Sequence, residues 1–308
     1  MDRRVDLSLD SKARDAAFAF LAEQCRAHGE ELPWSLLSRG FELEGRRIPL
    51  VGPQGIFKPR ALDLPLSILT APAGDGPRPY EDEHQPGELL SYCYRGEDPD
   101  HHENRGLRAC MDLHRPLIYF VGLDKGWYSA FWPAFVVGDS PDRLRFQVAI
   151  DDEMYASVGA GGSIPAEDDV RRRYVTAQHL RRLHQDEFRA RVLAAYAVRC
   201  TICKLRHREL LDAAHILSDK HPKGEPVVPN GLSMCKIHHA AFDQHILGVR
   251  PDAKIEVRED ILREKDGPML RHGLQGFQGK GLWLPRNSRL RPDPERLAER
   301  FELFRKAI

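Results

Sequence analysis

Two pairs of metal-ligand side chains constrain this chain more than any other feature. Cys200 and Cys203 form a C-x-x-C pair, and Cys235 and His238 form a C-x-x-H pair that begins 32 residues after Cys203. Three thiolates and one imidazole are the donor set of a closed tetrahedral zinc site. Such a site stabilises a small module that cannot bury enough apolar surface alone. The spacing therefore predicts a structural Zn²⁺ held by these four side chains.

A second set of polar residues lies between and directly after these pairs. His215 ends the apolar segment L-L-D-A-A-H, Asn230 opens the turn P-N-G-L, and His239 follows the last zinc ligand. A histidine is suited to deprotonating a water molecule, because its ordinary pKa of about 6.5 lies near neutral pH. We therefore assign His215 as a general base and expect Asn230 to brace the strand and loop that carry it.

His239 also has a partner for a second cation. Asp243 lies four residues later, on the same face of the helix expected here. An imidazole and a carboxylate placed in this way can hold Mg²⁺, Mn²⁺ or another divalent metal and leave positions open for water and phosphate. His245 is a reserve ligand, and Asp212 is the second choice for a ligand from the preceding strand.

The segment Cys200–Asp243, with its histidine, asparagine and histidine in this order, resembles the ββα-metal HNH module of bacterial restriction endonucleases. The resemblance implies a zinc-stabilised nuclease domain at 170–308 that hydrolyses phosphodiester bonds in double-stranded DNA. One such module cuts one strand, so double-strand cleavage would need a homodimer or two binding events. In many relatives an aspartate directly precedes the base histidine and binds the metal, whereas this chain has Ala214 there.

The first half of the chain has a different pattern. Apolar spacing up to Gly29 predicts a helix within a helical segment at 1–39, and residues 40–155 alternate short apolar runs with Gly and Pro. This predicts a β-rich domain with a small bent sheet or partial barrel, joined by a glycine-containing linker at 156–169 to the second domain. The fold class is therefore α+β. The expected elements are strands at Arg47–Val51, Leu89–Tyr94, Leu117–Val121, Phe131–Val137 and Leu144–Ala149, and a short helix at Asn104–His114.

A second resemblance covers about residues 40–155. The segments Y-C-Y-R-G-E-D-P-D-H-H-E-N-R-G-L-R, R-P-L-I-Y-F-V-G and G-W-Y-S-A-F-W-P-A-F-V-V-G are similar to the SRA-like domain of McrA-type modification-dependent restriction enzymes. The resemblance implies a PUA-like fold that flips a modified base, such as a modified cytosine, into a pocket lined by stacking rings and polar groups. The candidate DNA-binding and base-binding residues are Tyr94, Arg95, Asp98, Asp100, Asn104, Arg105, Tyr119, Trp127 and Tyr128.

Composition and charge indicate where in the cell the protein is expected and which kind of molecule it binds. The chain is 42% hydrophobic and 30% charged, which is typical of soluble globular proteins. No apolar run approaches the roughly 20 residues that span a bilayer, and the N-terminus lacks an apolar signal segment, so we expect a cytoplasmic protein without a membrane partner. The formal net charge is zero, but residues 171–208 carry eleven Arg and Lys against two acidic residues, which favours contact with DNA phosphates.

Three functions are compatible with these patterns. The leading hypothesis is a modification-dependent DNA endonuclease, which cuts near a modified base by using a divalent metal and a histidine base. An HNH nuclease that acts on unmodified DNA is the first alternative. A zinc-stabilised DNA-binding protein without catalysis is the second. Cleavage of modified and unmodified copies of one DNA separates the first two, and metal-dependent cutting excludes the third.

Overall fold

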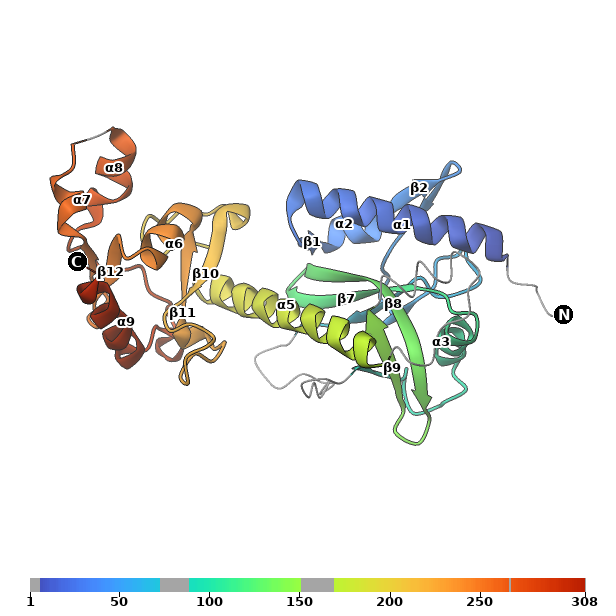
Figure 1. Ribbon diagram of the computed structural model, residues 1–308. Coiled ribbons are helices and arrows are strands. Elements are labelled where there is room, and N and C mark those ends of the chain that lie inside the picture. Colours follow the sequence, from blue (N-terminus) through green and yellow to red (C-terminus); the bar gives the residue numbers. More distant parts are fainter. Residues whose placement is uncertain (1–5, 73–88, 151–168, 266, 308) are drawn as a thin grey trace. The chain divides into compact units, whose positions relative to one another are not determined.

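The computed structural model describes residues 6–72, 89–150, 169–265 and 267–307, and part of the side chains of 169–181. The chain divides into two compact units, Met1–Leu183 and His184–Ile308, with the boundary inside helix α5 (Asp169–Ala195). Helices accompany a curled sheet, which confirms the predicted α+β class (Figure 1). The predicted linker lies outside the described residues except for its last position. None of the helices in the described ranges has the length and apolar character needed to cross a bilayer.

A seven-stranded sheet forms the centre of the first unit. Its strands are β1 (Glu31–Pro33), β4 (Ile56–Phe57), β5 (Ser67–Thr70), β6 (Leu90–Cys93), β7 (Leu117–Asp124), β8 (Trp127–Ser140) and β9 (Arg145–Ile150). The main path runs β4-β5-β7-β8-β9-β6, and β1 pairs with β8. Strands β5 and β7 are parallel, whereas the other neighbouring pairs are antiparallel. A separate hairpin consists of β2 (Phe41–Leu43) and β3 (Arg46–Ile48).

The predicted elements of this unit overlap the observed ones. Each of the five predicted strands shares residues with β3, β6, β7, β8 or β9, and the predicted short helix corresponds to α3 (His102–Asp112). The turn between β7 and β8 uses Gly126 at a φ of +80°, in the left-handed region that glycine adopts without a steric penalty. This turn brings Trp127 opposite Asp124 and sets the register of the hairpin.

Helix α1 (Leu7–His28) shares its apolar core with the sheet. The Asp6 side chain caps its first turn by accepting hydrogen bonds from two backbone N–H groups, and Gly29 follows its last residue. Ala13, Ala17 and Leu21 are fully buried in a cluster with apolar residues of β1 and β7. Helix α2 (Trp34–Arg39) adds Leu37 to the same cluster.

A buried ion pair connects α1 to the loops before β5 and β7. The Arg14 guanidinium donates to both Asp10 carboxylate oxygens at 2.7 and 2.8 Å, and also to the carbonyls of Pro65 and Pro116. Both side chains are almost completely buried. Because these groups satisfy one another, α1 is held at one defined position on the first unit.

The second unit contains a ββα arrangement followed by a second hairpin and three helices. Its elements are β10 (Leu211–His215), β11 (Gly231–Cys235), α6 (Lys236–Asp243), β12 (Leu247–Val249), β13 (Ile255–Val257), α7 (Glu259–Arg263), α8 (Pro268–Gly273) and α9 (Pro294–Lys306). Strands β10 and β11 are antiparallel, with His215 opposite Gly231. Phe188 and Val192 from α5, and Tyr196 directly after it, pack into one core with β10 and β11.

Candidate functional site

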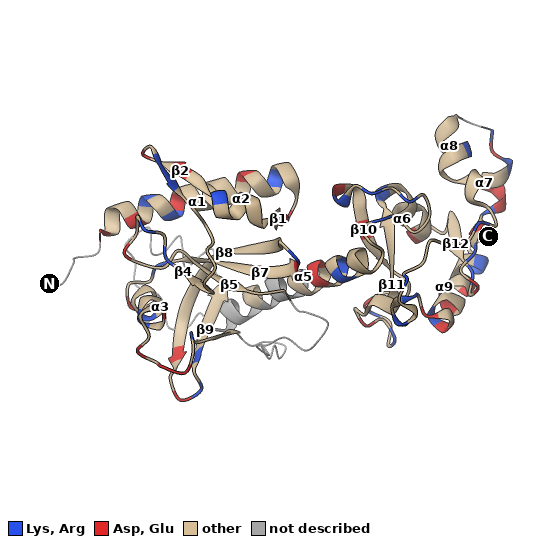
Figure 2. Ribbon diagram, turned by 180° about the vertical axis from the view of Figure 1, so that it is seen from behind, with Lys and Arg blue, Asp and Glu red and all other residues tan. Residues whose placement is uncertain are grey.

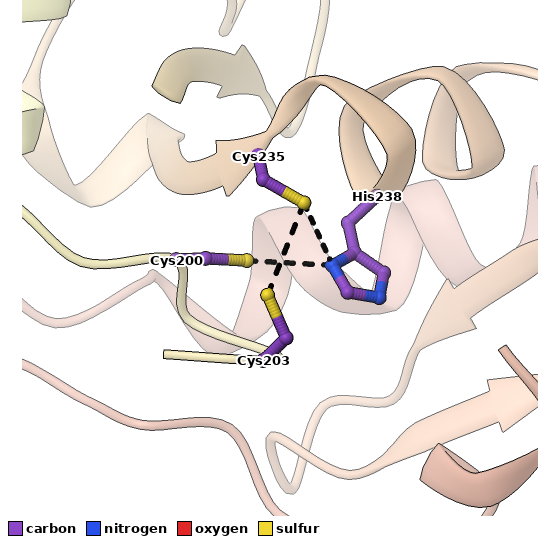
Figure 3. A group of neighbouring side chains, drawn as sticks. All are labelled: Cys200, Cys203, Cys235 and His238. Carbon is purple, nitrogen blue, oxygen red and sulfur yellow. Dashed lines mark hydrogen bonds between the residues drawn. The ribbon is translucent and has the colours of Figure 1, made fainter. Parts of the chain in front are cut away.

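Cys200, Cys203, Cys235 and His238 come together in the second unit (Figure 3). Their ligand atoms all lie within 4.8 Å of one another. The Sγ atoms of Cys203 and Cys235 are 3.9 Å apart, and His238 Nδ1 lies 3.5 Å from the Cys200 sulfur and 3.1 Å from the Cys235 sulfur. In tetrahedral zinc sites, sulfur atoms lie about 3.8 Å apart and sulfur and nitrogen about 3.6 Å apart. The four side chains therefore fit a Zn²⁺ ion.

Local structure points the histidine and one thiol toward this centre. Cys235 is the residue before α6, so that His238 lies in the first turn of the helix and directs Nδ1 back to the sulfurs. The opposite nitrogen, Nε2, donates to the carbonyl of Gly273 at 2.8 Å, which leaves the Nδ1 lone pair free to bind a metal. Hydrogen bonds from Cys203 and Cys235 lower the pKa of the Cys200 thiol and favour its thiolate.

His215 lies at the end of β10 against an aromatic ring. Its imidazole stacks on Phe188 with 4.1 Å between ring centroids and 23° between planes. Burial lowers the pKa of His215, an effect that the carboxylates of Asp219 and Asp243 partly oppose. A histidine held neutral in this way has an unprotonated nitrogen available at neutral pH. That is the protonation state required of a general base.

Asn230 is completely buried and holds the loop that follows His215. Its amide donates to the carbonyls of Leu217 and Glu225 at 3.0 and 3.1 Å, while its oxygen accepts from the Leu217 N–H at 3.0 Å. The Asn230 backbone carbonyl also accepts from the N–H of Ile216 at 2.9 Å. The side chain is therefore used inside the fold to fix the direction in which the chain leaves β10.

His239 and Asp243 lie one turn apart on α6 and face each other. His239 Nε2 is 3.3 Å from Asp243 Oδ2, and the two side chains are 26% and 52% exposed. Two ligands at right angles around a cation with bonds of about 2.1 Å lie about 3.0 Å apart. The observed pair fits two adjacent positions of a six-coordinate divalent cation, with its exposed side open to water and phosphate.

Asp212 lies on the other side of the same imidazole. Its Oδ2 is 3.4 Å from His239 Nδ1, and its Oδ1 accepts from Lys236 Nζ at 2.7 Å. Burial would raise the pKa of Asp212, but hydrogen bonds from His239 and Lys236 outweigh it and lower the pKa to about 2. Asp212 is thus ionised and contacts Nδ1 of His239. It does not face Nε2, the nitrogen that lies beside Asp243. Ala214 is buried in the apolar core.

One further side chain near Asp243 was not found from the sequence. Arg300 of α9 places its guanidinium 4.7 Å above the Phe242 ring and donates to the Phe242 carbonyl at 3.0 Å. The Arg300 Nη2 atom lies 3.8 Å from Asp243 Oδ1. Because 57 positions separate these two residues in the chain, no local motif relates them. The predicted reserve ligand, His245, keeps a buried Nδ1 atom without a hydrogen-bond partner.

The predicted base-binding residues of the first unit include both buried and exposed side chains. Tyr94, Tyr119 and Tyr128 are at most 9% exposed: Tyr94 and Tyr119 pack against rings of the sheet, and Tyr128 packs against Trp34 of α2. Asn104 is fully buried and bonds to the backbone of Arg95 and Asp98. These four side chains are thus used in internal packing. Alternating patterns place aromatic residues on strands but do not show which rings the core covers.

The remaining candidates lie nearer the surface. Asp100 and Arg105 are exposed, and Trp127 is partly exposed beside the β7–β8 turn. The Arg95 guanidinium lies 3.9 Å from a Glu103 carboxylate oxygen, and the Asp98 side chain accepts from the backbone N–H of Asp100. Asp98 therefore stabilises the turn before α3, and Arg95 already has an internal ionic partner.

The basic residues of 171–208 are also largely engaged within the fold, where they are described. Arg189 donates to the carbonyls of Arg208 and Leu211, and Arg191 donates to the carbonyl of Pro226. The side chains of Arg171, Arg172, Arg173 and Arg181 lie outside the described ones. The charge excess in the sequence therefore does not by itself define a DNA-binding face.

Comparison with known proteins assigns part of the second unit. Residues 200–250 match the family model for HNH endonucleases. The second unit therefore contains an HNH endonuclease domain. Its matched segment includes the four zinc-type ligands and His215, Asn230, His239 and Asp243. The comparison with curated proteins found no match.

Two solved structures of restriction endonucleases show a partial likeness. A modification-dependent TagI restriction endonuclease is 18% identical, covers 78% of this chain and 81% of its own, and gives a TM-score of 0.31. The Type IV phosphorothioation-dependent restriction endonuclease ScoMcrA is 16% identical, covers 57% and 52%, and gives a TM-score of 0.19. These TM-scores are too low to establish a shared fold.

Proposed function

We propose that this protein is a modification-dependent DNA endonuclease whose second unit hydrolyses phosphodiester bonds. The observation that carries the nuclease assignment is the arrangement of His215, His239 and Asp243 within the segment that matches the HNH family. A neutral histidine and an open pair of metal ligands are the two components that metal-assisted hydrolysis requires. The Cys₃His cluster supplies a rigid support for both.

His215 acts as the base in the proposed mechanism. Its imidazole accepts a proton from a water molecule, whose oxygen attacks phosphorus while the bond to the leaving sugar oxygen breaks. The leaving sugar oxygen takes a proton from solvent water, so that the products are a phosphate monoester and a sugar hydroxyl. Phe188 keeps the imidazole at a fixed angle through stacking, and Asn230 fixes the backbone beyond it.

His239 and Asp243 are the proposed ligands of the catalytic divalent metal, Mg²⁺, Mn²⁺ or a related cation. A cation bound there supplies positive charge that offsets the charge developing on the phosphate. Asp212 accepts from His239 Nδ1–H, which keeps the Nε2 lone pair directed toward Asp243. The chain thereby provides an imidazole in one tautomer beside an exposed carboxylate.

The proposed role of the first unit is recognition of a modified base, with modified cytosine as the first candidate. The support is the resemblance of residues 40–155 to SRA-like domains. On this proposal the protein binds double-stranded DNA, and a homodimer or two binding events allow both strands to be cut. The reader and the nuclease would then be separate parts of one chain.

A cleavage assay tests the proposal. One plasmid is prepared unmodified, with 5-methylcytosine, with 5-hydroxymethylcytosine and with phosphorothioate linkages, and each form is incubated with Mg²⁺, Mn²⁺, Co²⁺ or Ni²⁺. We expect cutting to be confined to a cytosine-modified form. Cutting confined to the phosphorothioated form would show that the protein recognises a modified DNA backbone and not a modified base. Equal cutting of all forms would favour an HNH nuclease that acts on unmodified DNA. Binding without cutting would favour the non-catalytic alternative.

A further inference from the structure

A cleft of about 700 Å³ opens on the first unit, and its lining includes His102, Glu103 and Gly106, which flank two of the predicted base-binding residues, Asn104 and Arg105, on α3. It is formed by the β2–β3 hairpin, the loops around β4 and the start of α3. Its lining includes four basic side chains, which come from two separate segments of the chain: Arg46, Arg47, Lys58 and Arg60. We call this feature the basic cleft. Figure 2 marks the Lys and Arg residues of the hairpin in blue.

The acidic residues of the basic cleft are already engaged elsewhere. Asp63 accepts a hydrogen bond from the backbone N–H of Asp6 at 3.2 Å, and Glu103 lies 3.9 Å from the guanidinium of Arg95. Both carboxylates therefore have partners on the protein. They offset the positive charge of the lining only in part, because four basic residues face two acidic ones.

The three arginines of the basic cleft are exposed and available. Among the described residues, no carboxylate lies within ion-pair distance of Arg46, Arg47 or Arg60. Lys58 differs, because its ammonium group donates to the carbonyl of Leu62 at 3.1 Å. This contrasts with Arg189 and Arg191, which donate to backbone carbonyls of the fold. Within the described part of the chain, the guanidinium groups of Arg46, Arg47 and Arg60 therefore have no carboxylate partner and can bind an external anion.

We propose that the basic cleft binds the sugar–phosphate backbone of double-stranded DNA. A guanidinium presents donors in a planar fork that matches two phosphate oxygens, and several such groups along one cleft suit a chain of regularly spaced phosphates. The inference rests on the proposed function and adds a specific surface to it. Because phosphate contacts carry no sequence information, the basic cleft supplies affinity and orientation, and base recognition is a separate task.

The test measures DNA binding by the full chain in a His215→Ala background, which prevents cutting. Arg46→Gln, Arg47→Gln and Arg60→Gln are combined, while Lys58 is retained because of its bond to Leu62. The matched control combines Arg26→Gln, Lys125→Gln and Arg143→Gln, three exposed basic residues of the same unit outside the basic cleft. Both variants lose three positive charges, so they differ only in where the charge is removed.

We expect the cleft variant to bind DNA about tenfold more weakly or worse at 0.1 M salt, and the control variant to bind like the parent. The slope of log Kd against log salt should fall by up to about 2.7, since each phosphate contact contributes about 0.9. Modified and unmodified duplexes should lose affinity by the same factor.

Two results would overturn the inference in distinguishable ways. A parent that binds DNA, together with a cleft variant of unchanged Kd and salt slope, would overturn the basic cleft alone and leave the proposed function standing. A parent that binds no duplex, modified or unmodified, would remove the proposed function and the inference with it. Circular dichroism and zinc content of each variant establish that the compared proteins are folded.

Discussion

The imidazole of His239 lies between two carboxylates, and each faces a different nitrogen. Asp212 is 3.4 Å from Nδ1, whereas Asp243 is 3.3 Å from Nε2. One ring cannot direct both nitrogens to a single cation, so the two carboxylates have different tasks. In the proposed function, the exposed Asp243 would share the cation with Nε2, and the ionised Asp212 would hold the ring and its tautomer.

Asp212→Asn should therefore weaken binding of the catalytic metal without emptying the zinc site. Loss of the ionised partner of a ligating histidine typically costs about 10- to 100-fold in metal affinity. Mn²⁺ binding to the zinc-loaded protein, followed by electron paramagnetic resonance, measures this effect without relying on activity. Lys236→Gln is the control, because it removes the ammonium group that donates to Asp212 and keeps the contacts of Asp212 with His239 and Arg189. Unchanged Mn²⁺ affinity in Asp212→Asn would show that Asp212 does not position His239.

The pH dependence of cleavage should report the environment of His215. Burial lowers its pKa, and only the neutral ring accepts a proton, so activity should persist as the pH falls and be lost only below about 6.5. The same shift means that protonation is easier in the unfolded chain, so this histidine reduces stability progressively below that pH. Titration of its ring by NMR in zinc-loaded protein without the second divalent metal measures the pKa directly. A pKa above the ordinary value would contradict this account.

At the scale of elements, the contact between α5 and β11 supports the His215 ring. Gly231 lies opposite His215, and a Cβ atom there would come within 2.4 Å of Val192 and 2.9 Å of Phe188. Phe188 is in turn the ring on which His215 stacks. Because Gly231 has no side chain, α5 can approach β11 closely enough to place Phe188 against the imidazole of His215.

Gly231→Ala should lower stability and activity together. Overpacking of a buried contact typically costs about 1–3 kcal/mol in the free energy of unfolding, and displacement of Phe188 would also tilt His215. Urea denaturation and cleavage rate are the two measurements. Gly281→Ala is the matched control, since its added Cβ meets no atom within 4 Å. Equal stability of both variants would show that α5 does not approach β11 this closely.

The Cys₃His cluster joins the turn after α5 to the junction of β11 and α6. Cys203→Ala removes one of the four candidate ligands and should empty the site and unfold the second unit. The reason is that the free energy of zinc binding, about 10 kcal/mol or more in small zinc modules, contributes to the free energy of folding. Zinc content and thermal unfolding are measured. Cys25→Ala, outside the cluster, should keep its zinc. A zinc-free Cys203→Ala protein with unchanged unfolding would contradict the structural role of this site.

Sequence patterns predicted some of these elements because their causes are local. The C-x-x-C and C-x-x-H spacings specify four ligands that the structure places within 4.8 Å, and turn residues mark the β7–β8 hairpin. The position of Asp212 relative to His239 depends on the pairing of β10 with β11 and on the direction of α6. Likewise, the burial of Tyr94 and Tyr119 depends on which face of the sheet the rest of the first unit covers. Such three-dimensional relations have no local signature.

At the scale of the whole molecule, the proposed structural and chemical roles fall on separate groups. We propose that the Cys₃His cluster stabilises the nuclease domain, that His215 and the His239–Asp243 pair carry the chemistry, and that the first unit contacts DNA through the basic cleft. These roles lie on different residues. A substitution that removes one role should therefore leave the other two intact, so that they can still be measured in the same variant.

The most direct test of the central claim is cleavage by His215→Ala, measured together with its zinc content. We expect the variant to retain zinc, thermal stability and DNA binding like the wild type, and to lose metal-dependent cutting by at least about 100-fold, which is the lower range for a general base. A variant that still cuts DNA at the wild-type rate, with zinc and fold intact, would contradict the assignment of His215 as the base.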